Sequence, residues 1–418
     1  MTDSTTASLD ELARRARVAS RALAGATSQS KAKALGTAAD LLERRIGEVL
    51  AANAEDVAAS EEAGVPPGAL DRLRLDPGRV AAMAGGLRAV AVLPDPVGEV
   101  VGSWERPDGL RIQQVRVPLG VVGIIYENRP NVTSDAFGLC LRSGNVAFLR
   151  GSSSAISSNR AVVEVLREGA VAARLPGDAV VLVTDTSREA AVAFMRMRGA
   201  IDVLIPRGGP SLIASVLEHA TVPYVIDGDG NCHVYVDAAA DLDMASSIVV
   251  NAKTQRPSVC NAAESLVVHA AVAEAFLPPL SFALDGVELV GDERSRAIVP
   301  SMGEASEADF ATEFLDLKLS VAVVDSLDEA IAHVNRYGSG HSEAIVTADD
   351  AAAERFTREV DAAAVLVNAS TRFVDGERFG LGAEIGISTQ KLHARGPMGL
   401  RELTCAKYVV RGRGHIVA

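Results

Sequence analysis

The sequence predicts an α/β protein with two parallel-sheet domains and a small antiparallel β element. Two observations predict the parallel sheets. Short apolar runs such as residues 120–126 (GVVGIIY) alternate with amphipathic helical segments, and a second series of this kind starts near Cys232. Apolar strands separated by helices are typical of parallel sheets covered on both faces. A third observation, an alternating pattern on both sides of residues 107–109, predicts the β element.

The N-terminal part of the chain is predicted to be helical. Residues 7–93 repeat apolar positions at helical spacing almost throughout. Ser8 and Ser28 stand where helix N-caps are expected, because a serine oxygen can accept a backbone N–H of the first turn.

The β element is predicted at residues 99–119 (EVVGSWERPDGLRIQQVRVPL), where two alternating segments flank Pro107, Asp108 and Gly109. A two-stranded ribbon has too little core to be stable alone. We therefore expect it to pair with another subunit or with another part of the chain. The alternating strand that closes the tail from Ser388 is a candidate partner.

The two βα series supply the remaining elements. In the first, we expect strands at 120–126, 145–151, 179–185, 201–209 and 222–227, and helices at 134–144, 158–177, 187–199 and 210–220. In the second, we expect strands at 232–237, 263–269, 318–325 and 342–348, and helices at 241–252 and 326–338. Ligands of such sheets bind beyond the carboxyl ends of the strands, where the polar loops fall.

Composition and charge exclude several classes of protein. The chain has 418 residues, of which 48% are hydrophobic and 23% charged, as in ordinary soluble proteins of more than one domain. A net charge of −13 argues against a general nucleic-acid or anionic-membrane surface, because both need a basic face. No apolar run reaches the roughly eighteen residues of a spanning helix, and the N-terminus lacks the apolar core of a secretion signal.

The cysteines and histidines indicate neither a disulfide framework nor a metal site. The four cysteines are scattered without CxxC pairing, so a reducing cytoplasm is the expected location. No histidine has metal-like spacing to another. His341 and His393 fall in glycine-containing loops, where they could contact substrate.

Four polar loops follow the apolar strands: 126–131 (YENRPN), 150–154 (RGSSS), 206–209 (PRGG) and 227–231 (DGDGN). Glycines allow close backbone approach and arginines pair with phosphates, so together these loops suit a phosphate-rich cofactor. An ordinary turn remains the alternative for each loop taken alone. Neither GxGxxG nor GxxxxGK(S/T) occurs, which disfavours a standard dinucleotide fold and a P-loop NTPase.

Cys260 is the candidate nucleophile. It lies in the irregular segment 251–265 (NAKTQRPSVCNAAES), after Lys253 and Arg256, and nearby cations favour the reactive thiolate. A structural turn is the alternative. Cys140 lies on an apolar helix and is expected in the core, and Cys232 and Cys405 have no comparable cationic loop.

Long segments of the chain resemble the gamma-glutamyl phosphate reductases, a family within the aldehyde dehydrogenase superfamily. The resemblance runs from about residue 95 to the end, and the helical N-terminus fits in length and pattern. The segments that carry it lie at 117–133, 144–153, 202–209, 229–237, 251–264, 314–324, 337–347 and 368–400.

The resemblance implies an aldehyde dehydrogenase-like fold of two Rossmann-like parallel-sheet domains with a small β oligomerisation element. The implied boundaries are 1–98 and 118–229 for an NADPH-binding domain, 230–387 for a catalytic domain that carries Cys260, and 99–117 with 388–418 for an oligomerisation hairpin and tail. We expect a homo-oligomer.

The resemblance also implies a reaction. NADPH would reduce L-glutamate 5-phosphate to L-glutamate 5-semialdehyde and phosphate, the second step of proline biosynthesis, through a thioacyl intermediate on Cys260. The glutamate 5-kinase that makes the acyl phosphate would be a functional neighbour.

The resemblance assigns roles to further residues. Asn128 stands at the superfamily's oxyanion-hole position, although serine is more common there in this family. Arg129, Asn131 or Arg256 could hold the acyl phosphate or the α-carboxylate, and His341 could contact substrate. The implied cofactor contacts are Arg150, Ser152, Arg207, Gly208, Gly209 and Glu313.

Three departures bear on this comparison. Ordinary aldehyde dehydrogenases carry their general-base glutamate in an ELGG segment, where this chain has DGDGNC at 227–232, so the thioacyl enzyme would not be hydrolysed. Ser258 stands where the family usually has glycine, and residues 152–154 read SSS where Gly-Ser-Glu is common.

Two other functions stay open from the sequence. The chain could be a phosphate-independent aldehyde dehydrogenase, or a non-catalytic subunit that binds a dinucleotide. Phosphate dependence of the reverse reaction distinguishes the first alternative, and cofactor binding without turnover would identify the second.

Overall fold

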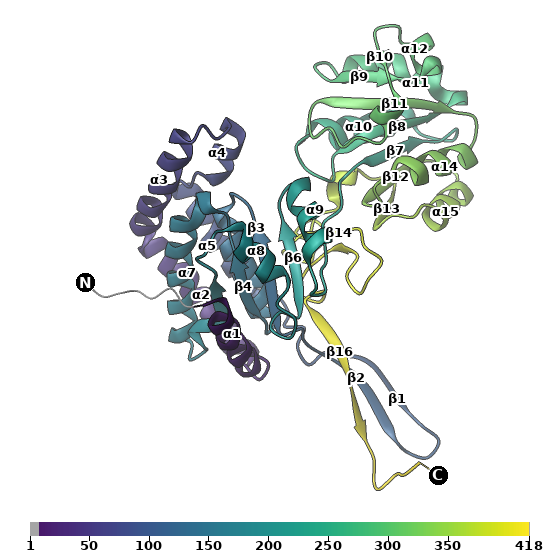
Figure 1. The fold of residues 1–418 in the computed structure, drawn as a ribbon. Coiled ribbons are helices and arrows are strands. Elements are labelled where there is room, and N and C mark those ends of the chain that lie inside the picture. Colours follow the sequence, from purple (N-terminus) through teal and green to yellow (C-terminus); the bar gives the residue numbers. More distant parts are fainter. Residues whose placement is uncertain (1–7, 418) are drawn as a thin grey trace. The chain divides into compact units, whose positions relative to one another are not determined.

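A computed structural model of the protein describes residues 8–417. The chain forms two compact units, which are drawn in Figure 1. The first consists of Met1–Ile226, Leu381–Gly386 and Met398–Ala418, and the second of Asp227–Gly380 and Ile387–Pro397. The tail that begins at Ser388 is therefore divided between the two units.

Five helices form the N-terminal part of the first unit: α1 (Leu9–Leu23), α2 (Ser28–Arg44), α3 (Ile46–Glu62), α4 (Pro67–Leu73) and α5 (Pro77–Val92). The prediction of a helical N-terminal part is confirmed. Ser8 caps α1 as predicted, since its Oγ accepts the N–H of Glu11 at 3.3 Å. The prediction for Ser28 was wrong, because Thr27 caps α2 and Ser28 is the first helical residue. Both residue types suit the cap, so local sequence alone could not decide between neighbours.

The first parallel sheet has the strand order β5-β4-β3-β6. Its strands are β3 (Val121–Tyr126), β4 (Val146–Arg150), β5 (Val180–Leu182) and β6 (Val203–Arg207). The connecting elements are α6 (Pro130–Arg142), η1 (Ser153–Ala155), α7 (Ile156–Ala172), η2 (Gly177–Ala179), α8 (Arg188–Met195) and α9 (Pro210–His219). Every residue of β3 is buried, which explains its continuous apolar run.

The strand predicted at 222–227 does not form. Two isolated bridges occur there instead, from Tyr224 to Leu204 beside the edge strand β6 and from Asp227 to Ser388. Pro223 has no N–H to donate to a ladder, and a proline within a strand limits the strand to a sheet edge. The apolar run at 222–227 alone does not show that the segment fails to form a strand.

A separate antiparallel sheet joins the hairpin to the end of the chain. Its order is β1-β2-β16, formed by β1 (Val100–Glu105), β2 (Arg111–Pro118) and β16 (Thr404–Arg411). β16 pairs with the whole of β2, and Figure 1 shows the three strands side by side. The predicted pairing of the tail with the hairpin is confirmed. The edge-to-face contact of Trp104 with Tyr408 links the outer strands across one face.

The second unit is built on a seven-stranded parallel sheet of order β10-β9-β11-β8-β7-β12-β13. Its strands are β7 (Cys232–Val236), β8 (Ala263–His269), β9 (Glu288–Gly291), β10 (Gly303–Glu304), β11 (Lys318–Val324), β12 (Ser342–Val346) and β13 (Ala364–Val367). Its helices are α10 (Leu242–Thr254), α11 (Ala270–Ala283), α12 (Glu293–Ile298), α13 (Glu307–Phe310), α14 (Leu327–Tyr337), α15 (Asp350–Glu359) and η3 (Thr371–Phe373). A two-stranded ribbon, β14 (Ile387–Ser388) with β15 (Gly396–Pro397), completes the unit.

Helices cover both faces of this sheet. Val234 and Val236 of β7 belong to the core formed with α10 and α11. Tyr235, between them, belongs to the core formed with α14 and α15, which Figure 1 shows packed together against the sheet. Successive strand residues point to opposite faces, so both faces of β7 are buried. The predicted α/β fold class is confirmed.

Candidate active site

The candidate cofactor loops of the first unit follow adjacent parallel strands. β3 lies between β4 and β6, and all three run in the same direction. The loops after them, at residues 127–129, 151–154 and 208–209, therefore fall at one edge of the sheet. This is the edge at which ligands of parallel α/β sheets bind.

Asn128 is held by two serines from the loop after β4. The hydroxyls of Ser152, at 2.9 Å, and Ser154 both donate to Asn128 Oδ1, and the N–H of Asn128 donates to Ser152 Oγ at 3.3 Å. The amide oxygen is thereby used as an acceptor, which leaves Nδ2 as a hydrogen-bond donor. The structure brings Asn128 and Ser152 together, whereas the resemblance assigned them to different tasks.

Arg150, at the end of β4, is tied to the loop after β5. Its Nη2 donates to the carbonyl oxygens of Thr186 at 2.7 Å and Ser187 at 2.9 Å. Its Nε is buried and has no hydrogen-bond partner within residues 8–417. Burial lowers the pKa of Arg150 from its ordinary value, and Asp185 opposes that shift. A cation with an unused buried donor is suited to a phosphate.

The Arg207–Gly209 loop leads from β6 into α9. A side chain on Gly208 would meet the side chains of Glu127 and Leu212, each 2.7 Å from the added Cβ, so both would have to shift. The Gly209 N–H donates to Glu127 Oε2 at 3.1 Å. This amide is therefore occupied by a carboxylate, and a pyrophosphate could bind it only if Glu127 moved.

Asn131 and Arg129 begin α6. Asn131 Nδ2 donates to Asp135 Oδ2 at 3.0 Å, one turn further along the helix. Both Arg129 and Asn131 are exposed. They are thus accessible to a ligand in the first unit, but the hydrogen bond of the Asn131 side chain goes to Asp135 and not to Asn128.

Cys260 lies in the loop between α10 and β8 and is partly exposed. Cys140 and Cys232 are fully buried, and burial raises the pKa of each thiol. The prediction that Cys140 belongs to the core is confirmed. Cys405 is exposed on β16, in the other unit. Of these cysteines, Cys260 alone combines access with a cationic loop.

The backbone of Cys260 packs against the loop at 227–231. A Cβ on Gly230 would lie 1.7 Å from the Cys260 carbonyl oxygen, so only glycine fits. The Cys232 thiol donates to the same oxygen at 3.2 Å. The Gly230 N–H donates to Glu313 Oε1 at 2.8 Å, and burial raises the pKa of Glu313. Gly230 thus connects the predicted nucleophile to the predicted ribose ligand.

His341 is fully buried at the start of β12. Its Nδ1 lies 2.7 Å from Ser342 Oγ and 3.8 Å from Cys232 Sγ. Burial lowers the pKa of His341 to about 4, so the ring is neutral near pH 7. His341 is therefore buried next to Cys232, where substrate has no access in this conformation.

A buried ion pair spans the Cys260 loop. Nζ of Lys253, at the end of α10, lies 2.5 Å from Oε2 of Glu264 on β8, and both side chains are fully buried. Oε1 of Glu264 accepts the N–H of Leu315 at 3.1 Å, two residues beyond Glu313. Burial raises the pKa of Glu264, and Lys253 opposes the shift. The pair fixes both ends of the nucleophile loop and links it to the Glu313 segment.

Sequence reasoning missed the segment 370–375, which follows the edge strand β13. Thr371 Oγ1 donates to the Asn261 carbonyl at 2.7 Å, and Arg372 Nε donates to Gln255 Oε1 at 3.0 Å. These hydrogen bonds hold the segment against the Cys260 loop. The rule used for the other loops, polar residues after an apolar strand, would have found it if residues 362–367 had been assigned as a strand.

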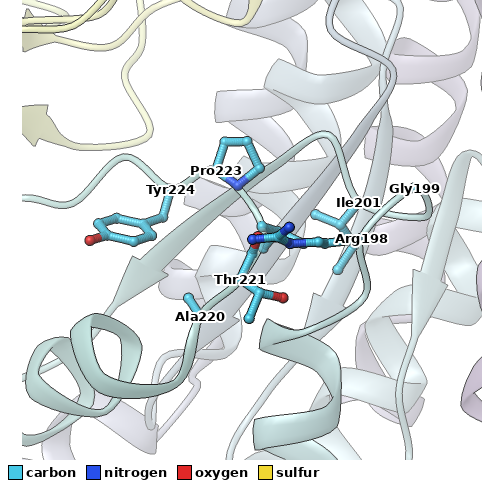
Figure 2. A pocket seen from close by; sticks show the side chains of 8 residues that line it. Arg198, Gly199, Ile201, Ala220, Thr221, Pro223 and Tyr224 are labelled. Carbon is cyan, nitrogen blue, oxygen red and sulfur yellow. The ribbon is translucent and has the colours of Figure 1, made fainter.

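The cavity shown in Figure 2 lies elsewhere in the first unit. It has a volume of about 550 Å³ and is lined by residues 198–201, before β6, and 220–224, after α9. Arg198 Nε donates to the Thr221 carbonyl at 2.6 Å across it. The cavity is at the amino end of β6, and the candidate cofactor loops are at the carboxyl end.

Residues 8–417 contain neither a candidate metal site nor a candidate membrane-spanning helix. Histidine, cysteine and acidic side chains do not gather there in any group that could hold a metal ion. No helix within that range has the length and apolar character needed to cross a membrane.

Comparison with known proteins places the chain in a family. The model of the aldehyde dehydrogenase family matches residues 1–316 and 319–408. The gamma-glutamyl phosphate reductase of Thermobifida fusca is 57% identical over 97% of this chain and 98% of its own length. That of Moorella thermoacetica is 57% identical over 96% of this chain and 97% of its own.

Solved structures agree. The crystal structure of gamma-glutamyl phosphate reductase from Thermotoga maritima has a TM-score of 0.96 and 48% identity, covering 98% of this chain and 100% of its own. An acetylating aldehyde dehydrogenase from Geobacillus thermoglucosidasius, 18% identical with a TM-score of 0.68 over 98% of this chain and 97% of its own, shares the fold. The chain therefore belongs to the gamma-glutamyl phosphate reductases of the aldehyde dehydrogenase family.

Proposed function

We propose that this chain catalyses the NADPH-dependent reduction of L-glutamate 5-phosphate to L-glutamate 5-semialdehyde and phosphate, the second step of proline biosynthesis from glutamate. Identity of 57% over almost the whole length of a gamma-glutamyl phosphate reductase carries the proposal. The accessible thiol of Cys260, on a loop fixed by Gly230 and Cys232, supports it independently.

Cys260 supplies the nucleophile in this proposal. Its thiolate attacks the C5 carbonyl carbon of the acyl phosphate, a C–S bond forms, and phosphate leaves with the electrons of the broken C–O bond. The locked Cys260 carbonyl fixes the backbone from which the thiol projects. Asn128 is the proposed oxyanion donor, since its Oδ1 is engaged and Nδ2 remains available.

Aldehyde dehydrogenases bind a nicotinamide dinucleotide, and NADPH is the form proposed here. The residues of the first unit fit it: Arg150 has a buried Nε without a partner in residues 8–417, and the Ser152 hydroxyl lies in the following loop. Arg207, Gly208 and Gly209 are the proposed pyrophosphate contacts, and Glu313 the proposed ribose ligand. When bound, NADPH supplies the hydride that reduces the thioacyl group. The C–S bond then breaks, which releases the aldehyde and restores the Cys260 thiolate.

The proposed division of labour follows the predicted boundaries. Residues 1–98 and 118–229 would bind NADPH, residues 230–387 would carry the chemistry, and residues 99–117 with 388–418 would join subunits. Trp104, Tyr408 and Val410 of the β1-β2-β16 sheet are exposed to 46%, 62% and 55%, as expected for a surface that contacts a second copy. Sedimentation analysis tests this assembly, and a monomer at all concentrations would contradict it. Glutamate 5-kinase remains the proposed functional neighbour.

The reverse reaction tests the proposed activity. With glutamate semialdehyde, NADP⁺ and inorganic phosphate, the wild-type protein should form NADPH, and Cys260→Ala should abolish this because no other accessible cysteine lies in a cationic loop. Cys405→Ala, which removes the exposed thiol of β16, is the matched control and should keep wild-type activity.

Two results would contradict the proposal. Turnover by Cys260→Ala would show that Cys260 is not the nucleophile. Wild-type turnover that proceeds equally well without phosphate would instead identify a phosphate-independent aldehyde dehydrogenase.

A further inference from the structure

A buried arginine lies against the Cys260 loop. Arg372 is in η3, and hydrogen bonds fasten this segment to the loop on both sides of Cys260: Arg372 Nε to Gln255 Oε1 at 3.0 Å, and Thr371 Oγ1 to the Asn261 carbonyl at 2.7 Å. Asn261 Nδ2 donates in return to the Val374 carbonyl at 2.9 Å. The position of Arg372 relative to the nucleophile loop is therefore fixed.

Arg372 has no carboxylate partner among residues 8–417. It is only 7% exposed, and the one hydrogen bond of its side chain in that range is the bond from Nε to the neutral amide of Gln255. Asp375, the nearby acid, accepts the backbone N–H groups of Glu377 at 3.0 Å and Arg378 at 3.3 Å. By contrast, buried Lys253 is paired with Glu264. A buried unpaired cation is costly, so a site that keeps one is suited to an anionic ligand.

Two further cations stand near Arg372. Burial, then Arg378, then Arg256, lower the pKa of Arg372, while Asp375 and Cys260 raise it. The guanidinium stays charged, because arginine does not lose its proton in proteins. Positive charge from three side chains thus gathers around Arg372, and the interaction of Arg372 with Cys260 favours the thiolate.

We propose that Arg372 binds the phosphate group of the acyl phosphate in the forward reaction and inorganic phosphate in the reverse reaction, with Arg256 and Arg378 adding charge. This inference rests on the proposed function, and it assigns the leaving-group subsite of that reaction.

The chemistry of the substrate favours phosphate over the α-carboxylate. The phosphate is bonded through one oxygen to the carbon that Cys260 attacks, whereas the α-carboxylate is at the other end of a five-carbon chain. Arg372 is hydrogen-bonded to Gln255, and its neighbour Thr371 to Asn261, which adjoins Cys260. Arg372 is therefore assigned to the phosphate, the group nearer to the carbon that Cys260 attacks. The two terminal nitrogens of its planar guanidinium match phosphate oxygens in a bidentate arrangement.

The test measures the KM for inorganic phosphate in the reverse reaction for Arg372→Gln, Arg372→Lys and wild type. Loss of a charge-assisted hydrogen bond should raise that KM roughly ten- to a hundredfold in Arg372→Gln. Arg372→Lys keeps the charge but lacks the paired donors of the guanidinium, so its KM for phosphate should lie between those of wild type and Arg372→Gln. The KM for the semialdehyde should stay close to the wild-type value in both. Arg358→Gln removes an exposed arginine from the second unit and should match wild type.

A second readout does not depend on turnover. Inorganic phosphate should slow alkylation of Cys260 by iodoacetamide in the wild type and should fail to do so in Arg372→Gln, with loss of the label in Cys260→Ala as the check on the site. If Arg372→Gln does not fold, the same comparison with Arg372→Lys decides the question.

The outcomes separate the two proposals. An unchanged phosphate KM with retained protection in the Arg372 variants, or a rise in the semialdehyde KM alone, would overturn the Arg372 assignment while the activity stands. Wild type that phosphate protects but that never forms NADPH would contradict the proposed function and leave the phosphate site intact.

Discussion

Asn128 shows how one side chain acquires a defined role from its neighbours. An asparagine amide can turn either end to a ligand, but Ser152 and Ser154 both present hydroxyl donors to Oδ1. The sequence marked Asn128 and the run 152–154 as separate departures from the family pattern. The structure puts them in contact, and spacing along the chain could not have predicted this.

Ser154→Ala tests this arrangement. Loss of one hydrogen bond to Oδ1 should lower kcat roughly fivefold and leave KM nearly unchanged, since a neutral hydrogen bond is worth about 1 kcal/mol. Ser153→Ala is the matched control, because Ser153 is exposed and has no hydrogen bond from its side chain among the described residues. A rise in KM with an unchanged kcat would place Ser154 in substrate or cofactor binding instead.

The buried imidazole of His341 gives a pH prediction. Burial lowers its pKa to about 4 in the folded protein, so the unfolded chain, with a pKa near 6.5, binds more protons between these values. Stability contributed by the neutral ring is complete above pH 6.5 and is lost as the pH falls toward 4. The expected loss from pH 7 to pH 5 is about 2 kcal/mol.

Urea unfolding at pH 7 and pH 5 checks the His341 prediction. His341→Asn removes the titrating group and should show a smaller loss over this range than wild type, whatever its stability at pH 7. The same loss in both proteins would mean that His341 does not titrate as the burial implies.

At the scale of elements, the sequence predicted most helices and strands because each must cover or form a buried sheet. β3 is apolar on both faces, and this pattern identifies it without further information. The edge strands β10 and β13 and the short strand β9 next to β10 were missed, since partly exposed strands lack such a pattern. Missing β13 also hid the segment with Arg372, so an error in an element became an error in the site.

The Lys253–Glu264 pair tests how elements hold the nucleophile loop. It joins the end of α10 to the start of β8. Removing one partner leaves a buried charge, so Lys253→Met should cost about 3–5 kcal/mol in unfolding free energy, and the double variant Lys253→Met/Glu264→Leu should cost less. Urea unfolding measures both.

The control for this pair is Arg336→Ala, which breaks the exposed pair with Glu307 and should change the urea midpoint little. A double variant less stable than Lys253→Met would contradict the interpretation of Glu264 as an uncompensated charge in the single variant.

At the scale of the whole molecule, the reaction assigns separate tasks to the two units. The candidate cofactor loops lie at the end of the first sheet, and Cys260, Glu313 and Arg372 belong to the second unit. Sequence reasoning identified both sets because polar loops follow apolar strands in each unit. It could not predict that Gly230 connects Cys260 to Glu313, since that contact depends on a fold that brings residues 230, 260 and 313 together.

The central claim is that Cys260 carries the glutamyl group. Wild-type protein mixed with glutamate semialdehyde and NADP⁺ in the absence of phosphate should form one NADPH per active site and then stop, because residues 227–232 lack the glutamate that serves as general base in ordinary aldehyde dehydrogenases. Peptide mass spectrometry should find the glutamyl group on Cys260, and added phosphate should release it. Continued turnover without phosphate, or an adduct on any other residue, would contradict the account.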